Sequence, residues 1–352
     1  MPGAARLAHH ARPGCGDHTI GHPPHKCLLI AHRGACAQLP EHTLPAYALA
    51  ARQGADFIEM DLVMTRDGEL IARHDNRLEL STDVACRPAF TGHRTRKSVD
   101  GVVQHGWFSE DFTLAEIRSL RAVEPLPGLR PHNCRYNGLF QVPTLQEIID
   151  LAKRLGRETG RTIGLYPETK HPSHFEAQGL PISTRLVEQL HANDYRHRDA
   201  PVFIQSFEVG NLRRLRGLTD LSLVQLLAPG GMPWDIRSAG GSLDYAAMAS
   251  PQGLAEIAGY ADAVGVEKRH FILPPDTDGR LDLARATGLV TAAHAVGLQV
   301  HAWTFSPENR YLPTKLRRGG SDQAWGDLAA ELHAYRQVGV DGCFVDLVMA
   351  TV

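Results

Sequence analysis

The chain has 352 residues, of which 43% are hydrophobic and 22% are charged, and its formal net charge is -2. This composition is typical of a globular protein, and it excludes a disordered or fibrous chain. The absence of a basic excess argues against a nucleic-acid partner, and no apolar run approaches the roughly 20 residues that span a bilayer.

The first 26 residues are rich in His, Pro, Gly and Ala. They contain no apolar core of the kind that a secretory signal needs. We therefore expect residues 1–26 to form a flexible leader and residues 27–352 to form a single domain.

Short apolar strands begin directly after this leader. Residues 28–31 form an apolar run suited to a strand buried on both faces. A helix is expected over residues 43–53, followed by a strand over 57–64 and a short returning strand over 69–73. Gly54 is a typical end for the helix.

The alternation of helices and strands continues to the C-terminus. A capping box at Thr144 and Glu147 marks the start of one helix. Six further strands are predicted, at residues 162–165, 202–205, 221–227, 263–266, 299–304 and 343–345. Six further helices are predicted, at residues 144–155, 183–191, 209–215, 252–259, 283–296 and 325–338. Eight strands, most of them followed by a helix, predict a (β/α)₈ TIM barrel, with a doubly wound open sheet as the alternative.

One long stretch, residues 76–142, interrupts this rhythm and contains one expected helix, at residues 113–121. It is too long for a barrel loop without structure of its own. We interpret it as a small insertion between the second strand and its helix. Loops at this end of a barrel strand border the active site, so the insertion is expected to shape access to it.

Acidic and basic side chains gather where the predicted strands end. His32 and Arg33 close the first strand, and Glu59 and Asp61 lie on one face of the second because residues two apart on a strand face the same side. Two buried carboxylates on one face repel each other unless a cation joins them. A divalent ion such as Ca²⁺ or Mg²⁺ is the simplest partner, and a pair flanking a surface strand is the alternative.

Two further clusters complete the pattern. His74 ends the returning strand, and Glu168 and Lys170 follow the third barrel strand. Three acids and water would satisfy a divalent cation, while the basic side chains would bind phosphate oxygens. His32 and His74 could divide the acid and base roles because the usual pKa of histidine is near neutrality. The set suits phosphoryl transfer.

At this point the chain resembles the glycerophosphodiester phosphodiesterases. The resemblance rests on His32-Arg33-Gly34, Pro40-Glu41-His42-Thr43, Glu59-Met60-Asp61 and His74-Asp75, in the order and spacing of that family. Further matches to its bacterial periplasmic branch cover nearly all of residues 28–345, and they include the segments 111–117, 138–144, 166–172 and 203–208. The stretch 232–250 departs from the pattern.

The resemblance implies a metal-dependent enzyme that releases sn-glycerol 3-phosphate and an alcohol from substrates such as glycerophosphocholine or glycerophosphoethanolamine. It implies the roles of the following residues: His32 and His74 as acid and base, Glu59, Asp61 and Glu168 as ligands of Ca²⁺ or else Mg²⁺, and Arg33 and Lys170 near the phosphate. Glu41 is expected beside the site, either orienting His32 or Arg33 or lying at a helix N-terminus. Phe207 and Trp303 are candidates for lining the alcohol pocket, with core packing as the alternative.

Several readings stay open at this level. The nucleophile is either water or the neighbouring glycerol hydroxyl, and either histidine could be the acid. A sphingomyelinase D-type phospholipase, a surface binding protein on the same barrel and a metal-binding barrel of other chemistry are the rival functions. The resemblance implies a periplasmic location, whereas the N-terminus as written leaves a cytoplasmic one open. Nothing in the pattern indicates an oligomeric state.

Overall fold

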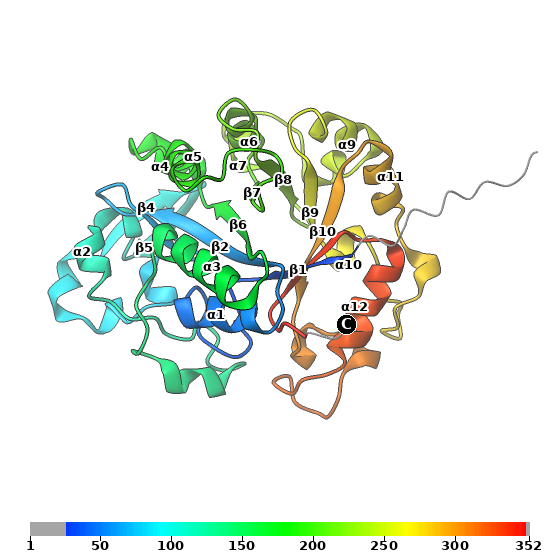
Figure 1. Cartoon of the computed structure of the whole chain (residues 1–352), viewed down its shortest axis with the longest axis horizontal. Helices are drawn as coiled ribbons and strands as arrows, with labels where there is room; N and C mark the ends of the chain where they lie inside the picture. The colour runs from blue at the N-terminus through cyan, green and yellow to red at the C-terminus, as the bar shows by residue number, and fades with distance from the viewer. Residues whose placement is uncertain (1–25, 350–352) are drawn as a thin grey trace, which may run out of the picture.

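The computed structural model describes residues 26–349 and shows eight parallel strands closed into a barrel (Figure 1). Strand β1 (Leu28–Ala31) pairs with both β2 (Phe57–Met64) and the last strand, β11 (Gly342–Val345). The barrel is completed, in chain order, by β6 (Gly164–Thr169), β7 (Phe203–Ser206), β8 (Ser222–Leu227), β9 (Ala263–Glu267) and β10 (Gln299–Phe305). The predicted TIM barrel is confirmed, and the open-sheet alternative is wrong because β1 joins the two edges. The leader expected over residues 1–26 lies outside the described residues except for Lys26.

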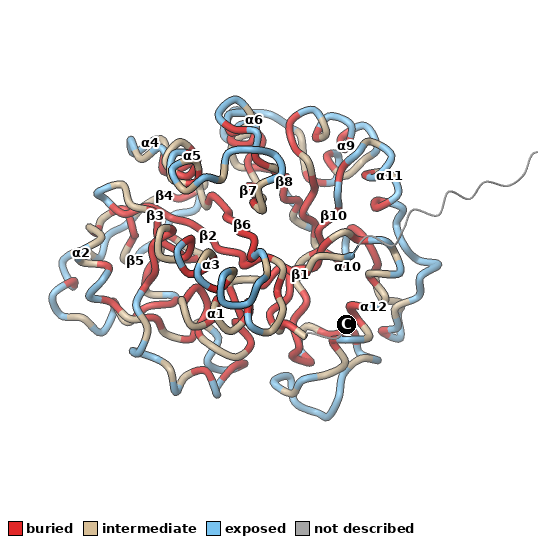
Figure 2. The backbone as a smooth tube through the Cα atoms, in the orientation of Figure 1, coloured by how far each residue is buried: buried red, intermediate tan, exposed pale blue. Residues whose placement is uncertain are grey.

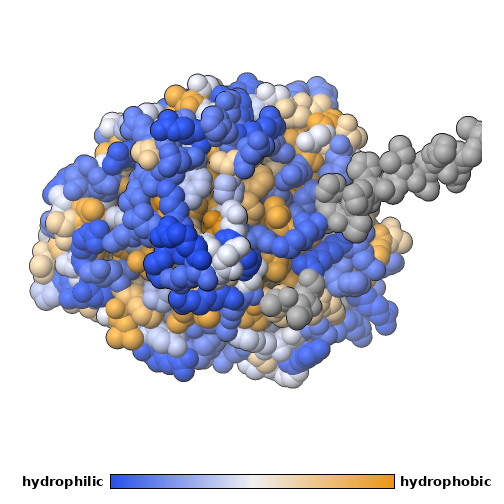
Figure 3. Space-filling view, viewed as in Figure 1, coloured by the Kyte–Doolittle hydropathy of each residue, from blue (hydrophilic) through white to orange (hydrophobic). Residues whose placement is uncertain are grey.

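Helices between the strands form the outer layer, and the side of the molecule seen in Figure 3 is mainly hydrophilic. Local capping explains where two of them start. Thr43 accepts a hydrogen bond from the backbone of Ala46, and Thr144 and Glu147 form the predicted capping box. The main covering helices are α1 (Leu44–Arg52), α3 (Leu145–Thr159), α5 (Ile182–Ala192), α6 (Val209–Arg216), α9 (Pro251–Ile257), α11 (Leu289–Ala295) and α12 (Leu328–Val338). Among residues 26–349, no helix is long and apolar enough to cross a membrane.

Three predicted elements differ from the structure. The helix expected over 113–121 is only α2 (Leu114–Ile117), because the backbone of Arg121 bonds to Asp83 instead of continuing the helix. The helix expected over 283–296 is split into a short 3₁₀ turn (Leu283–Arg285) and α11, with Gly288 at φ +84° between them. Strand β6 extends beyond the predicted 162–165 to Thr169, so Glu168 lies on the strand.

The barrel interior has an aromatic floor. Phe57, Tyr166, Phe203 and Phe344 pack with ring centroids 5.0 to 6.1 Å apart, and the strands that carry them are mostly buried (Figure 2). Because side chains alternate along a strand, the residues two and four positions after Phe57 share its inward direction. The floor therefore supports a second, polar layer nearer the carboxyl ends of the strands.

The segment between β3 (Leu70–Ala72) and α3 contains a hairpin that the sequence analysis did not predict. Its strands are β4 (Thr95–Val99) and β5 (Val102–Gly106). The two turn residues, Asp100 and Gly101, have φ of 48° and 77°, as a tight two-residue hairpin turn requires. Short 3₁₀ helices and α2 occupy the rest of this segment, which lies at the left of Figure 1.

The floor predicts an effect on stability. A Cβ added at Gly164 would lie 2.3 Å from the ring of Phe57, so Gly164→Ala should destabilise the protein by about 1–3 kcal/mol through overpacking. Urea denaturation measures this change. Gly128→Ala is the matched control, because Gly128 is exposed and a Cβ there meets nothing within 4 Å. Equal unfolding midpoints for the two variants would contradict a rigid floor.

Candidate active site

Three acidic side chains converge at the carboxyl ends of β2 and β6. Glu59, Asp61 and Glu168 each offer one oxygen, and these oxygens all lie within 4.8 Å of one another. The three residues are 1%, 2% and 6% exposed, so all three side chains are almost completely buried. The polar layer above the floor is thus a cluster of carboxylates.

Burial and neighbouring charges shift the pKa values of these three acids. Burial, reinforced by Asp61, raises the pKa of Glu59 well above its usual value, and burial likewise raises that of Glu168 to about 8. Burial acts in the same direction on Asp61, but Lys170 and the neighbouring histidines hold the pKa of Asp61 well below its usual value. The protein's own groups therefore neutralise Asp61 and leave Glu59 and Glu168 poorly compensated.

Two cations border the acids. The Nζ of Lys170 lies 3.0 Å from Glu168 and 3.8 Å from Asp61, and the Nε of Arg33 lies 3.5 Å from Asp61. The backbone N–H of Arg33, which has φ of 58°, donates to Glu59. Both predicted phosphate-binding residues thus lie beside the predicted metal ligands.

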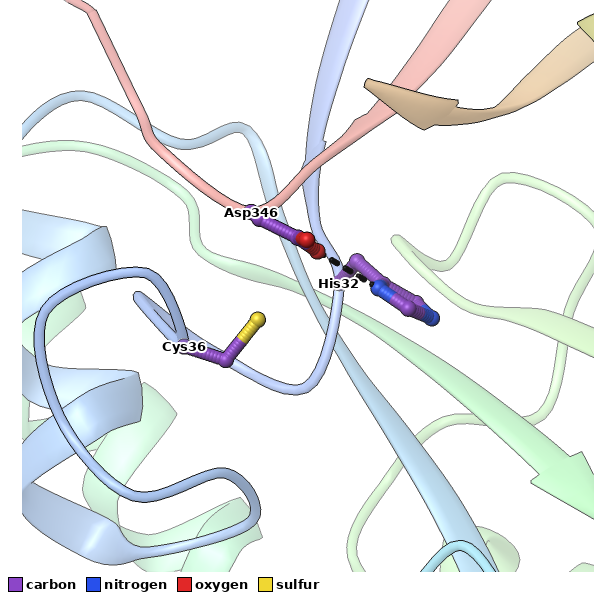
Figure 4. Close-up of side chains that lie close together, drawn as sticks. All are labelled: His32, Cys36 and Asp346. Carbon is purple, nitrogen blue, oxygen red and sulfur yellow. Dashed lines mark hydrogen bonds and ion pairs between the residues drawn. The ribbon is translucent and has the colours of Figure 1, made fainter. Parts of the chain in front are cut away.

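His32 is held by a carboxylate that the sequence analysis missed. Its Nδ1 hydrogen-bonds to Asp346 at 2.7 Å (Figure 4), and Asp346 also accepts from Arg130 and Ser306. Nδ1 is thus engaged, and Nε2 on the other side of the ring accepts a hydrogen bond from Arg33 Nε at 3.2 Å. Asp346 therefore fixes the orientation of the imidazole, as such carboxylates do in acid–base sites.

Cys36 completes a second group with His32 and Asp346 (Figure 4). Burial, with a further contribution from Asp346, raises the pKa of the Cys36 thiol well above its usual value. Asp346 is already paired with Arg130. A neutral thiol and a neutralised acid make this group a poor metal site.

His74 is oriented in the same way on the other side of the acids. Its Nδ1 hydrogen-bonds to Asp75 at 2.8 Å, and its Nε2 lies 3.5 Å from Lys170. Its pKa is lowered by partial burial and by Arg33 and Lys170. A chain of contacts therefore runs from His32 through Arg33, Asp61 and Lys170 to His74.

Glu41 and His42 hydrogen-bond to side chains of the site and hold them in place. Glu41 accepts from Arg33 Nη1 at 2.9 Å, so it orients Arg33 and not His32. Arg33, followed by the neighbouring histidines, overcomes the effect of burial and lowers the pKa of Glu41 to about 2. The buried His42 contacts Asp61 Oδ2 at 2.9 Å, a contact that its place in the Pro40–Thr43 motif did not reveal.

Two cavities open on either side of this cluster. One, of about 400 Å³, is lined by residues that include His32, Arg33 and Trp303. The other, of about 270 Å³, is lined by residues that include Glu168, Lys170 and Phe207. The rings of Phe207 and Trp303 meet edge to face, 6.3 Å apart. The two aromatic candidates thus line different cavities.

The segment 76–142 is tied directly to the site. The guanidinium of Arg130 donates to Glu308 at 2.7 Å and to Asp346 at 2.6 Å, and all three side chains are buried. Asp346 directly follows the last barrel strand, a position at which barrel active-site residues are expected. That position was the one signal in the sequence that could have identified it.

Comparisons with known proteins identify the family of this chain. The chain matches the Glycerophosphoryl diester phosphodiesterase family over residues 32–350. It is 32% identical to a glycerophosphodiester phosphodiesterase of Arabidopsis thaliana, with 88% of this chain and 86% of the relative covered, and 31% identical to one of Haemophilus influenzae, with 85% and 87% covered.

Solved structures show the same fold. A phosphodiesterase of Oleispira antarctica, in complex with the product sn-glycerol-3-phosphate, matches with a TM-score of 0.56 at 20% identity, covering 91% of this chain and 93% of that one. A putative family enzyme of Silicibacter pomeroyi matches with a TM-score of 0.59 at 20% identity, covering 93% and 92%. The chain therefore belongs to the glycerophosphoryl diester phosphodiesterase family and is an enzyme of that class.

Proposed function

We propose that the protein hydrolyses glycerophosphodiesters such as glycerophosphocholine and glycerophosphoethanolamine, with a divalent cation and two histidines. The observation that carries this proposal is the buried trio Glu59, Asp61 and Glu168, bordered by two cations that each contact a histidine. The product bound to the Oleispira antarctica enzyme, sn-glycerol-3-phosphate, supports the same substrate class.

The donor set fits a hard divalent cation. All three groups are carboxylates, and burial raises the pKa of Glu59 and of Glu168, so a bound cation would favour the ionised form of both. We propose Glu59, Asp61 and Glu168 as ligands of Ca²⁺, with Mg²⁺ as the alternative. When bound, the cation would neutralise charge on a phosphate oxygen and organise the substrate.

Arg33 and Lys170 would hold the remaining phosphate oxygens and stabilise the charge that develops during transfer. Both side chains are mostly enclosed, with 20% and 11% of their surface exposed. Glu41 would keep the Arg33 guanidinium pointed at the site through its 2.9 Å contact.

The histidines would move the protons through Nε2, because Asp346 and Asp75 occupy their Nδ1 atoms. One Nε2 would take the proton of the nucleophile as its oxygen bonds to phosphorus. The other would donate a proton to the alcohol oxygen as the bond between that oxygen and phosphorus breaks. The nucleophile is either water or the adjacent glycerol hydroxyl, which would form a cyclic phosphate that water then opens.

The rival functions find less support. The curated relatives that align over most of this chain are named glycerophosphodiester phosphodiesterases, and none of these names points to a sphingomyelinase D. A binding protein without turnover would have no need of two imidazoles oriented by separate carboxylates.

Metal removal tests the proposed cation. Chelation should abolish the release of glycerol 3-phosphate from glycerophosphocholine, and added Ca²⁺ should restore it. Free Ca²⁺ at about 100 times its Kd should also stabilise the fold by about 2.7 kcal/mol, seen as a higher Tm. Glu59→Gln should lose that rise in Tm, whereas Glu256→Gln, exposed on α9, should keep it. Full activity after exhaustive chelation would exclude metal dependence.

Replacing either histidine tests the proton transfers. His32→Ala and His74→Ala should each fold normally, as judged by circular dichroism, and should each lose about 10²–10⁴-fold in kcat. His333→Ala, exposed on α12, should retain the wild-type rate. A wild-type kcat in either site variant would remove that residue from the mechanism.

The route of attack can be tested with a diester that has no glycerol hydroxyl. If the neighbouring hydroxyl is the nucleophile, such a diester should be inert, and a transient cyclic phosphate should appear with glycerophosphocholine. If water attacks directly, both diesters should be cleaved without a cyclic intermediate, and ¹⁸O from labelled water should enter the phosphate product of each. Cleavage of the glycerol-less diester at a comparable rate would exclude the cyclic route.

A further inference from the structure

The smaller cavity beside the acids is enclosed by four separate parts of the chain. Glu168 and Lys170 of the site form one wall, and Phe207 and Glu208 after β7 form the second. The third is the segment 232–250, which departs from the family pattern. The fourth is Asp100, at the tip of the β4–β5 hairpin. At about 270 Å³ the cavity is smaller than the pockets that hold drug-sized ligands, so it suits an alcohol of a few heavy atoms.

The hairpin tip and the segment 232–250 meet at an aromatic ring. A Cβ added at Gly101 would lie 2.6 Å from Trp234, so the ring packs directly against the glycine backbone. Asp100 is fixed by a 2.6 Å hydrogen bond to His171. Trp234, Phe207 and Tyr245 thus give the cavity three aromatic walls.

Carboxyl groups lie in and beside the same cavity. Glu208, which is 4% exposed, and Asp100 line it, and Asp235 lies close by on α7 (Trp234–Ser238). Burial raises the pKa of the Tyr245 phenol, and the nearby carboxylates, Asp235 first, raise it further. Glu208 accepts hydrogen bonds from Ser173 but makes no ion pair with any residue between 26 and 349, and burial raises its pKa to about 7.

One polar group in the cavity has no partner. Tyr245 is 6% exposed, and its hydroxyl makes no hydrogen bond to any residue between 26 and 349. The hydroxyl oxygen itself keeps contact with solvent, so it is available to hydrogen-bond to a molecule bound in the cavity.

Most of the basic side chains that line the cavity already pair with acidic side chains. Lys170 pairs with Glu168 and Asp61, and His171 pairs with Asp100. Arg237 is exposed at the rim. Asp100 and Glu168 are engaged in the same pairs, so the interior is left with aromatic faces and the unpaired carboxyl group of Glu208.

We propose that this cavity is the subsite for the leaving alcohol, and that it selects alcohols carrying an ammonium group. A cation against Trp234 gains from the ring's π face, and Glu208 complements its charge. The larger cavity, which Arg33, Arg130, Lys268 and Arg269 line, is left for the glycerol phosphate side. This assignment rests on the proposed function.

Two diesters that yield the same measured product test the proposal. Wild-type protein should release glycerol 3-phosphate from glycerophosphocholine with a kcat/KM at least tenfold above that for the uncharged head group of glycerophosphoglycerol. Trp234→Leu should raise KM for glycerophosphocholine about tenfold, a value between those of an exposed and a desolvated cation–π contact, with a smaller change in kcat. Trp234→Phe should keep most of the preference.

Glu208→Gln provides a second variant that removes charge but not shape. It should lower the preference for glycerophosphocholine about fivefold. Trp325→Leu is the control, because this half-exposed ring lies outside both cavities, and it should leave both kcat/KM values unchanged.

The outcomes separate this assignment from the proposed function. If wild-type protein cleaves both diesters equally, or if the variants lower both kcat/KM values in parallel, the ammonium subsite is wrong while the diesterase function stands. If wild-type protein with Ca²⁺ or Mg²⁺ cleaves neither diester, the proposed function fails and the subsite fails with it.

Discussion

The mutual repulsion of three buried carboxylates is the constraint around which this end of the barrel is built. Glu59 and Asp61 are forced into the same interior as Glu168 because strand side chains alternate and β2 and β6 pair in parallel, with Asp61 opposite Glu168. The aromatic floor leaves these acids no room to retreat into the barrel, and burial together with their mutual repulsion raises the pKa of Glu59 and of Glu168. Arg33, Lys170 and His42 relieve part of it, and the part left over is what makes the site suited to a divalent cation.

Most of the barrel could be predicted from the sequence because each strand is a short, mostly apolar run between helix signals. Strand β2 was predicted with its observed bounds, and the spacing of Glu59 and Asp61 was enough to place both acids inside. The helix over 283–296 was mispredicted because a glycine inside a helical pattern was not weighed; Gly288 takes a left-handed φ and ends the pattern there. The β4–β5 hairpin was missed although Asp100-Gly101 is a recognised turn pair, since its strands carry mostly exposed side chains and lack an apolar alternation.

The acids and cations at the centre of the candidate site could be predicted from the sequence, whereas several residues that hold them in place could not. Side chains that lie on strands follow from periodicity, whereas Asp346, Arg130 and His42 are brought in by contacts between residues far apart in the sequence. Arg130 reaches the site from 216 positions before Asp346, and no local pattern encodes that pairing. The segment 76–142 thereby joins the site in two places. Its Arg130 forms an ion pair with Asp346, the carboxylate that holds His32. Its hairpin tip packs against Trp234 and so closes the smaller cavity.

We propose that a divalent cation at the barrel mouth is bound by the three buried carboxylates of Glu59, Asp61 and Glu168. A crystal structure of the protein grown with Ca²⁺ and sn-glycerol 3-phosphate tests this proposal most directly. We expect one ion bound by all three carboxylates and contacting the phosphate or glycerol oxygens, with His32 and His74 beside the phosphate. An ion found elsewhere, with the three acids empty at saturating Ca²⁺, would contradict it.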